Sequence, residues 1–382
     1  MRIGIDCRTI LDPKRGEQAG VGHYTYFLVE NLLRNDKKNE YVLFFDPKIG
    51  DAGHFKQKNV SIKFFPFVDY KKFLPGAYSH LLIAAYVERE KIDVFHSPAS
   101  TIPLAYSKKA VVTIHDLAIY HNPDWFPKGQ KFSTRVAVPQ TIKKAKKIIA
   151  VSEYTKKDLI KYFKTPEDKI EIIYNGVEPK KDIDDVKPED REAVKNKFDI
   201  KQEFILSVGT IQPRKNVEGL IKAFDNLRSS KIFENYQLVI AGGKGWKYNS
   251  VFKLVKELAL TKKVVFTDYV TKKDKWSLLN AASVFVFPSF YEGFGLSILE
   301  AMQQGTPVVT SKITSMPEVA GDAGALIDPS DINDLAKGIE KVLTNDDYRD
   351  KLIQLGRKQA NKFSWEKCAR ETLAVYEKIN KN

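Results

Sequence analysis

The stretch from Val284 to Glu300, VFVFPSFYEGFGLSILE, decides the fold. Its first four residues are apolar and rich in Val and Phe, which favours a buried strand. A loop with Gly293 and Gly295 follows, and a helix is predicted to begin near Leu296. A strand, a glycine loop and a helix in this order make up one step of a parallel sheet that is covered by helices.

The same alternation extends over the whole chain. In the first part, strands are predicted at Arg2–Asp6, Tyr41–Phe45, Ser61–Phe65, Val94–His96, Ala110–Ile114, Ile148–Val151 and Ile170–Tyr174. In the second part they are predicted at Phe204–Val208, Gln237–Ala241, Val264–Phe266, Val284–Phe287, Pro307–Thr310 and Ala325–Ile327. Predicted helices lie between them, and the chain is predicted to be helical from Asp347 to its end.

These two series predict an α/β protein with two Rossmann-like, doubly wound domains in tandem. The domains are expected over residues 1–177 and 203–360. A linker is expected over 178–202, because this segment is rich in Asp, Glu, Lys and Pro and shows no apolar periodicity. A final helix over 361–382 is expected to pack back on the first domain. Doubly wound domains bind ligands at the carboxyl ends of their strands, so a site is expected in a cleft between two facing domains.

Composition narrows the class of protein. A length of 382 residues suits two or three domains, and 62 Lys and Arg against 48 Asp and Glu make the chain basic. Two cysteines, Cys7 and Cys368, cannot form a disulfide framework or a cysteine-rich zinc site. No apolar run reaches the roughly 18 to 20 residues of a membrane-spanning helix. A cytoplasmic protein is therefore expected.

The positive charge is concentrated in residues 128–164, which hold eleven basic and two acidic side chains. One interpretation is a solvated, lysine-rich helix face. The other is a surface for a polyanion, which could be an anionic membrane, an anionic acceptor or a nucleic acid. Aromatic residues are not interleaved with the lysines as they are in many nucleic-acid sites, so nucleic acid is not expected as a partner.

Two segments of the first domain are candidate binding elements. Gly20 and Gly22 open a predicted helix, where free N–H groups and the helix dipole favour a phosphate, although a purely structural turn fits equally well. His115 ends a buried strand and is followed by Asp116, which could orient the imidazole. His96, at the end of another strand, competes for the same role, and a structural histidine is the alternative for both.

In the second domain, Arg214 and Lys215 stand just before a predicted helix. Two cations at the positive end of a helix dipole are unfavourable unless an anion lies there, and a diphosphate would supply that anion. Glu292 precedes the next helix and Glu300 lies about two turns along it. Carboxylates on either side of a phosphate-binding helix start suit the hydroxyl groups of a nucleotide sugar. No group of His, Cys, Asp or Glu has metal-ligand spacing, so no metal is expected.

The segment from Glu292 to Glu300 is similar to the E-x7-E signature of the retaining glycosyltransferases of family 4, which have the GT-B architecture. The resemblance extends over nearly the whole chain and is closest to the mannosyltransferase-type branch. It is carried by Gly20-Val-Gly22, His115-Asp116, IIAVSEYTKKDL at 148–159, IIYNGVE at 172–178, VGTIQPRKN at 208–216, LVIAGGKGW at 238–246, GTPVV at 305–309 and PEVAGDAGALIDP at 317–329.

The resemblance implies roles for single residues. The catalytic set would be His115, Arg214, Lys215 and Glu292, and the donor-binding set Gly20, Gly22, Thr210, Tyr269, Val270, Phe294, Gly295, Leu296, Ser297 and Glu300. His115 would contact the donor sugar, the two cations the leaving diphosphate, and Glu292 the transferred sugar. Glu300 would hold the ribose, and the backbone at 269–270 the base. Close relatives often have Glu in place of Gln212 and Arg in place of His23, which leaves these two roles open.

The function implied is transfer of a hexose, with retention, from a nucleotide diphosphate sugar to a glycan or lipid-linked acceptor. Mannose from GDP-mannose is the expected donor, no cofactor or metal is expected, and the first domain would serve the acceptor and the second the donor. The basic stretch would allow peripheral contact with the inner face of the cytoplasmic membrane. A related GT-B enzyme, such as a phosphorylase or epimerase, and a polyanion-binding protein are the alternatives.

Overall fold

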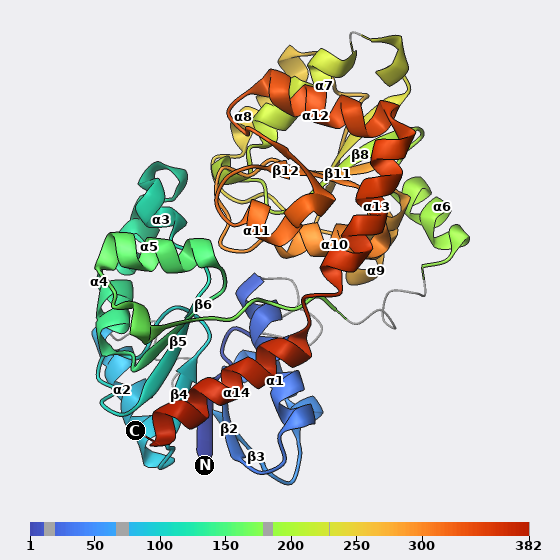
Figure 1. Cartoon of the computed structure of the whole chain (residues 1–382). Coiled ribbons are helices and arrows are strands. Elements are labelled where there is room, and N and C mark those ends of the chain that lie inside the picture. Colours follow the sequence, from blue (N-terminus) through green and yellow to red (C-terminus); the bar gives the residue numbers. More distant parts are fainter. Residues whose placement is uncertain (11–19, 66–75, 179–185, 229, 382) are drawn as a thin grey trace. The chain divides into compact units, whose positions relative to one another are not determined.

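A computed structural model describes residues 1–10, 20–65, 76–178, 186–228 and 230–381. The chain forms two compact units (Figure 1). The first comprises Met1–His121, Lys128–Gly176 and Trp365–Asn382, and the second comprises Asn122–Pro127 and Val177–Ser364. The described residues do not include Gln18 and Ala19, which precede Gly20 in the expected glycine loop. They also do not include residues 179–185 of the expected linker.

The first unit is built on a parallel sheet of seven strands in the order β3-β2-β1-β4-β5-β6-β7. Its strands are β1 (Arg2–Asp6), β2 (Glu40–Phe45), β3 (Val60–Phe64), β4 (Val94–Ser97), β5 (Ala110–Ile114), β6 (Lys147–Ala150) and β7 (Ile170–Ile172). The central strands β4 and β5 are buried over their whole length, as strands with helices on both faces are, and their polar residues His96, Ser97 and Thr113 are buried as well.

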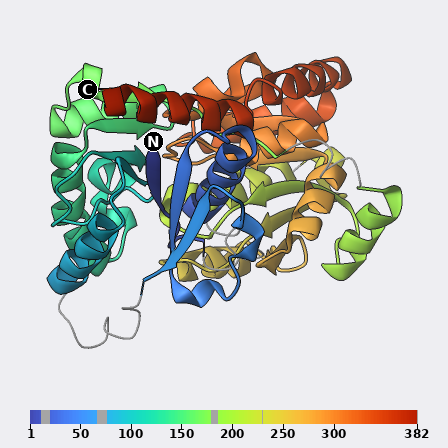
Figure 2. The same ribbon diagram turned by 90° about the horizontal axis from the view of Figure 1, so that it is seen from below.

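The helices of this unit are α1 (Gly20–Asn35), α2 (Gly76–Arg89), α3 (Ala118–His121), α4 (Lys128–Lys144), α5 (Glu153–Phe163) and α14 (Trp365–Lys381). The last of them, α14, is separated by nearly 200 residues of sequence from the rest of the unit, yet it packs on α1 (Figure 1). It also contacts β4 and β6, and the view turned by 90° again shows it against the first sheet (Figure 2).

The attachment of α14 is apolar at its start and polar near its end. The indole of Trp365 stacks on Phe27 of α1, with ring centroids 5.5 Å apart. Towards the other end, the hydroxyl of Tyr376 forms a 2.5 Å hydrogen bond with Nδ1 of His96 on β4. Buried residues recur along α14 at helical spacing, which explains why this face needs a partner.

The second unit has a parallel sheet of six strands in the order β10-β9-β8-β11-β12-β13. Its strands are β8 (Glu203–Val208), β9 (Tyr236–Ala241), β10 (Val264–Asp268), β11 (Val284–Phe287), β12 (Val308–Ser311) and β13 (Gly324–Ile327). Its helices are α6 (Pro188–Lys197), α7 (Val217–Arg228), α8 (Asn249–Glu257), α9 (Lys272–Ala281), α10 (Leu296–Gln304), α11 (Met316–Ala320), α12 (Ile332–Thr344) and α13 (Asp346–Ala360).

The predicted fold class is confirmed, because both units are parallel, doubly wound sheets and every predicted strand is present to within about two residues. Two details differ. The segment 178–202 contains α6, whose Asp190 pairs with Lys273 of α9. The chain is not helical throughout from Asp347, because residues 361–364 separate α13 from α14. In the described part of the chain, no helix combines the length and the apolar character that crossing a membrane requires.

Candidate active site

The strand order of the second sheet places a topological switch point at its centre. The order reverses between β8 and β11, so the loops that leave these two strands turn to opposite faces of the sheet. Ligands of doubly wound domains bind at such a switch point. One of the loops contains the 3-10 turn η8 (Pro213–Lys215), and the other contains Glu292. The backbone N–H of Phe290 donates to the carbonyl of Arg214, at 2.8 Å, and ties the two loops together.

Three charged side chains meet between these loops. Arg214 Nη1 donates to Oε2 of Glu292 at 2.8 Å and to the carbonyl oxygen of Tyr291 at 3.0 Å. Lys215 Nζ lies 2.7 Å from the other carboxylate oxygen of Glu292 and 4.6 Å from the centre of the Phe287 ring. We call these three charged residues the Glu292 cluster. The anion expected beside the two cations was a diphosphate, and the structure shows in addition a carboxylate from the neighbouring loop.

The two cations determine the ionisation of Glu292. Burial alone would raise its pKa, but the charges of Arg214 and Lys215 lower the pKa of Glu292 to about 2. The carboxylate is therefore ionised at neutral pH, and the cluster carries two positive charges against one negative charge. The remaining positive charge favours an additional anion at this edge of the sheet.

Hydroxyl groups hold the backbone around Glu292. Ser315 Oγ donates to the carbonyls of Glu292, at 2.9 Å, and Phe294, at 3.0 Å. The N–H of Glu292 donates to Oγ1 of Thr314 at 3.3 Å. Gly295, the N-cap of α10, has a φ of 103°, a left-handed conformation that favours glycine. The turn into α10 therefore depends on Gly295 and on the hydroxyls that follow β12.

Glycines allow a third loop of the second unit to touch the loop after β8. The loop after β8 and the loop after β9 form a parallel bridge at Ile211 and Lys244. A Cβ atom on Gly242, whose φ is 150°, would lie 2.2 Å from the carbonyl oxygen of Gly209. A Cβ atom on Gly245 would lie 2.7 Å from Thr210 Cγ2. Thr210, one of the predicted donor-binding residues, is exposed beside this contact.

Glu300 belongs to a second ion pair. It is buried on α10, and its Oε1 lies 2.7 Å from Nζ of Lys275 on α9. Lys275 was not predictable from the sequence, because the run of four charged residues from 272 to 275 gives no sign of which one faces α10. Its neighbour Lys272 lies 2.5 Å from the buried carboxylate of Glu178. Burial raises the pKa of Glu178, and the charge of Lys272 opposes that rise.

The other predicted donor-binding residues of this unit differ in exposure. Tyr269 is exposed and Val270 is half-buried, directly after β10. Leu296 and Ser297 are half-buried in the first turn of α10, whereas Phe294 is buried against Phe363, with ring centroids 5.7 Å apart. Gln212 is buried beside the two cations, and its role stays open.

A short segment from the first half of the sequence is part of the second unit. Residues 122–127 include the 3-10 turn η5 (Pro123–Trp125). The carbonyl of Trp125 accepts a hydrogen bond from the indole N–H of Trp246, and Lys247 Nζ donates to the carbonyl of Asp124 at 2.6 Å. The Trp125 ring also stacks on Phe290, at 6.1 Å between centroids. This segment therefore contacts both the loop after β9 and the loop after β11, which carries Glu292.

In the first unit, His115 follows β5 and remains half-exposed. Its Nε2 donates to the carbonyl of Pro98 at 2.6 Å, and its ring packs edge-on against Tyr24 at 4.7 Å. Burial lowers the pKa of His115. The charge of Asp116 opposes the effect of burial on the pKa of His115, and Oδ1 of Asp116 accepts the N–H of Ala118 where the chain turns into α3.

His96 is a structural histidine. It is fully buried, and its two ring nitrogens are hydrogen bonded to Tyr376, at 2.5 Å, and to Oγ1 of Thr113, at 2.9 Å. Burial and the neighbouring His115 lower the pKa of His96 to about 3, so the ring is neutral at pH 7. His115 is thus the better candidate of the two strand-end histidines.

The glycines predicted to face a ligand lie in the first turn of α1. Gly20 is exposed, and a Cβ atom built on it would meet open space. Gly22 is buried. His23, next in the chain, is buried against the rings of Phe27 and Trp365. The structure thus assembles Arg214, Lys215 and Glu292, places Glu300 in a separate pair, and leaves His115 and the α1 glycines on the first unit.

Two family models match the chain. Residues 188–359 match the model described as glycosyl transferases group 1, and residues 19–181 match the model described as glycosyltransferase family 4. The O-antigen chain mannosyltransferase B of Escherichia coli is 32% identical over 376 residues, which cover 96% of this chain and 97% of the relative. A serotype-specific mannosyltransferase of the same organism is 32% identical over 71% of this chain, but the match covers only 33% of the relative.

Solved structures show the same fold at low identity. The Anabaena protein HepE, solved in complex with UDP and glucose, superposes with a TM-score of 0.75 at 17% identity and covers 99% of both chains. A glycosyltransferase from Rickettsia africae gives 0.72 at 20% identity and covers 100% of this chain and 99% of the other. With this fold and these family matches, the chain belongs to the group 1 and family 4 glycosyltransferases.

Proposed function

We propose that this glycosyltransferase transfers mannose from GDP-mannose, with retention of configuration, to a growing glycan or lipid-linked acceptor. The observation that carries the proposal is the Glu292 cluster at the switch point of the second sheet. The full-length resemblance to an O-antigen chain mannosyltransferase supports mannose as the sugar and a surface glycan as the acceptor. A phosphorylase, an epimerase and a polyanion-binding protein are less consistent with these family matches.

The excess positive charge of the cluster suits a diphosphate leaving group. Negative charge develops on the diphosphate as the glycosidic bond breaks, and preorganised cations stabilise that charge most in the transition state. Arg214 can form a bidentate contact with a phosphate, and Lys215 contributes a point charge. Since the two side chains supply the charge, we propose that the reaction needs no metal ion.

Glu292 fixes the cations and presents a carboxylate to the sugar. Its low pKa keeps it ionised, so it accepts hydrogen bonds from sugar hydroxyls and cannot act as a general acid at neutral pH. Glu300, two turns along α10, is the proposed acceptor for the ribose hydroxyls, with Lys275 holding its carboxylate in place. His115 is proposed to contact the donor sugar through the imidazole nitrogen that does not bind Pro98.

A donor screen tests this proposal directly. The purified chain is heated with GDP-mannose, UDP-glucose, GDP and guanosine, each with and without EDTA. We expect GDP-mannose and GDP to raise the melting temperature and guanosine to have little effect, because a ligand that binds only the folded state stabilises it. The product made from GDP-mannose on a mannose-terminated acceptor is then checked by NMR for an α linkage. If another nucleotide sugar stabilises the chain and GDP-mannose does not, the donor assignment is wrong.

We further propose that the first unit makes peripheral contact with an anionic membrane. Lys143, at the end of α4, is exposed, as are three lysines on or after α5, Lys157, Lys161 and Lys164. Each basic side chain near an anionic surface contributes on the order of 1 kcal/mol, so four allow reversible attachment at low salt. Lys144 and Lys147 are less available, because Lys144 donates to the carbonyl of Leu104 and Lys147 pairs with Glu171.

Vesicle flotation tests the membrane contact. The wild-type chain is expected to float with vesicles containing phosphatidylglycerol at low salt, and to remain unbound with phosphatidylcholine alone or at high salt. The fourfold change to Glu at 143, 157, 161 and 164 should abolish flotation. Equal flotation of the variant would show that these lysines are not the contact.

A further inference from the structure

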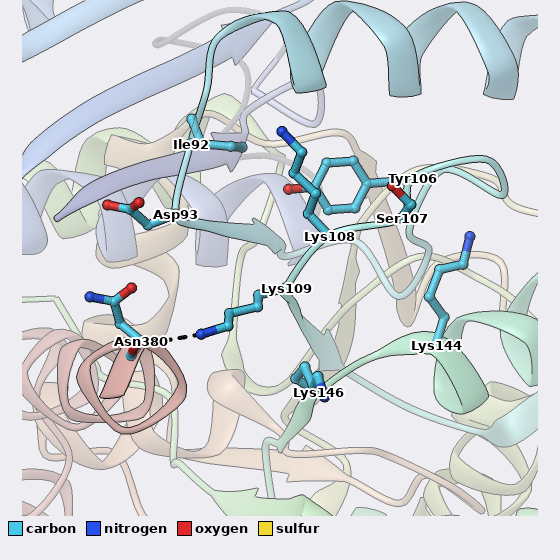
Figure 3. A pocket seen from close by; sticks show the side chains of 9 residues that line it. All are labelled: Ile92, Asp93, Tyr106, Ser107, Lys108, Lys109, Lys144, Lys146 and Asn380. Carbon is cyan, nitrogen blue, oxygen red and sulfur yellow. Dashed lines mark hydrogen bonds between the residues drawn. The ribbon is translucent and has the colours of Figure 1, made fainter. Parts of the chain in front are cut away.

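A basic hollow lies at the amino edge of the first sheet, opposite the strand ends that carry His96 and His115. It has a volume of about 530 Å³ (Figure 3). Its lining comprises Ile92, Asp93, Tyr106, Ser107, Lys108, Lys109, Lys144, Lys146 and Asn380. Four lysines against one aspartate give the lining a net charge of +3. No step of the proposed reaction uses this hollow.

The parallel sheet explains why lysines from distant parts of the sequence meet here. Neighbouring strands of such a sheet begin at the same edge, so residues that precede β5 and β6 become neighbours. Lys108 and Lys109 directly precede β5, and Lys146 directly precedes β6. The N–H of Lys146 donates to the carbonyl of Ala110, at 2.8 Å, and this bond fixes the two strand starts side by side.

Two of the lysines are held in place by the walls of the hollow. Lys109 Nζ donates to the carbonyl of Ile379, at 3.1 Å, and to that of Asn380, at 3.5 Å, near the end of α14 (Figure 3). Lys144 Nζ donates to the carbonyl of Leu104. Carbonyl partners satisfy hydrogen bonds but do not neutralise charge, so both ammonium groups remain net positive charges.

The other two lysines are exposed at the mouth. Lys108 and Lys146 make no ion pair or side-chain hydrogen bond with any described residue of the chain. Two acids accept hydrogen bonds in this region: Asp93 accepts the N–H of Arg2 at 2.7 Å, and Glu88 accepts the N–H and hydroxyl of Ser107, a residue of the lining, both at 2.9 Å. The hydrogen bonds from Ser107 and then the charges of Lys108 and Lys144 lower the pKa of Glu88.

A buried hydroxyl adds a second polar feature. The Tyr106 side chain lines the hollow and is fully buried, and its hydroxyl has no hydrogen-bond partner among the described residues. A buried hydroxyl without a partner is costly unless a ligand or water satisfies it. Burial and the charge of Glu88 raise the pKa of Tyr106, so the hydroxyl stays protonated and can donate to an acceptor oxygen.

We propose that this hollow binds a phosphate group. A phosphate near neutral pH carries between one and two negative charges, which complement a lining with a net charge of +3. Its oxygens can accept hydrogen bonds from several ammonium groups at once, and the volume leaves room for a substituent on the phosphate. Both a lipid headgroup and a soluble phosphate ester present this chemistry. The inference concerns the first unit alone and does not depend on the proposed transfer reaction.

Removing the two exposed charges tests the proposal. The double variant Lys108→Gln, Lys146→Gln is compared with Lys56→Gln, Lys58→Gln, which removes two exposed lysines just before β3, at the far end of the same sheet. Both variants lower the net charge equally and should fold, because all four side chains are exposed. Binding of glycerol 3-phosphate is measured by calorimetry, and binding to phosphatidylglycerol vesicles by flotation in the presence and absence of glycerol 3-phosphate.

The expected result is saturable binding of glycerol 3-phosphate that weakens by roughly tenfold in the hollow variant and by less than about twofold in the control. If the hollow variant also binds vesicles more weakly and glycerol 3-phosphate competes with the vesicles, the ligand is a lipid headgroup. If only the binding of glycerol 3-phosphate changes, the ligand is a soluble phosphate ester. Equal losses in both variants, or no saturable binding of either probe, would overturn the proposal. Binding of GDP, measured in parallel, should be unchanged, so a failure here is distinct from a failure of the proposed transferase.

Discussion

At the scale of single residues, the Glu292 cluster combines charge balance with a fixed geometry. Glu292 is buried, so its charge is tolerated only because Arg214 and Lys215 approach both of its oxygens. Removing a partner from such a cluster leaves an uncompensated buried charge. Each substitution here is therefore expected to change stability as well as catalysis, and the two effects need separate measurements.

The first prediction concerns the pH dependence of stability. The folded-state pKa of Glu292, about 2, lies below the unfolded value of roughly 4.3, so ionisation of this residue favours the folded state above that unfolded value. The contribution is on the order of 2 to 3 kcal/mol and is lost as the pH falls from about 4.3 towards 2. Glu292→Gln should therefore destabilise the chain more at pH 6 than at pH 3.5.

Urea unfolding of both proteins at the two pH values measures this difference. Glu318→Gln serves as a control, because it makes the same change at a half-buried glutamate on α11 that is not part of the Glu292 cluster. A loss of stability in Glu292→Gln that is the same at both pH values would contradict the assignment of the low pKa to this residue.

The second prediction separates the roles of the cluster in catalysis. Arg214→Ala and Lys215→Ala should each lower kcat strongly and weaken binding of GDP, with little effect on guanosine, because the lost charge faces the diphosphate. Glu292→Gln should lower kcat more than it raises the KM for the donor, since its contacts with the sugar strengthen in the transition state. Steady-state kinetics and calorimetry with GDP and guanosine provide the test. Full activity in the Arg214, Lys215 double variant would refute the site.

At the scale of elements, the packing of a helix on its neighbour brings together residues whose roles depend on each other. Helices α9 and α10 place Lys275 against Glu300, and helix α14 places Tyr376 against His96. Each contact joins segments distant in sequence, so neither partner could be chosen from a sequence window. Both contacts can be removed by nearly isosteric substitutions.

The third prediction concerns Lys275. If Lys275 positions Glu300 for the ribose, Lys275→Met should raise the KM for the nucleotide sugar and the Kd of guanosine, with a smaller change in kcat. Lys273→Met is the matched control: the same change on the same helix, at an exposed residue that pairs with Asp190 instead. A decrease in kcat alone, with unchanged nucleoside affinity, would show that Lys275 does not act through the ribose.

The fourth prediction concerns the attachment of α14. Tyr376→Phe deletes the 2.5 Å hydrogen bond and leaves Nδ1 of His96 buried without that partner, which should cost about 1 to 3 kcal/mol of unfolding free energy. Tyr248→Phe, in the second unit, is the control; its side chain is half-buried and its hydroxyl has no hydrogen bond to a described residue. Denaturant unfolding should show a clear loss for Tyr376→Phe and almost none for Tyr248→Phe.

At the scale of the whole molecule, the first unit is completed by the last helix of the chain. Residues 365–382 belong to it although the entire second unit precedes them in sequence. The apolar side of α14, beginning with Trp365, covers α1. The first unit is thus assembled from three separate stretches of sequence, and its stability depends on the chain after Ser364.

The fifth prediction follows from this arrangement. Ending the chain at Ser364 should expose the α1 face that Trp365 covers and increase amide hydrogen exchange in α1 and β4, while α7 and α10 remain protected. Binding of GDP, which is assigned to the second unit, should be retained. Removing only residues 381–382 is the control. Loss of protection in both units to the same extent would show that α14 stabilises the molecule as one cooperative body.

The sequence by itself determined the elements and the family of this protein. Strands such as β5 and β11 were predictable because a strand buried on both faces is a nearly continuous apolar run, whatever its neighbours are. The glycine loops and the pair Glu292 and Glu300 were recognisable because each motif lies within a short window of the sequence. Even so, the glycines after β9 acquire their explanation only from the loop after β8 that they touch.

Tertiary structure decided which of these residues act together. Arg214 and Glu292 are 78 positions apart and meet because β8 pairs with β11 in space, whereas β9 and β10 intervene in sequence. The pairing of Lys275 with Glu300, the burial of His96 under α14 and the basic hollow before β5 and β6 arise in the same way. Side-chain contacts between distant elements depend on strand order and helix packing, and local periodicity contains no information on either.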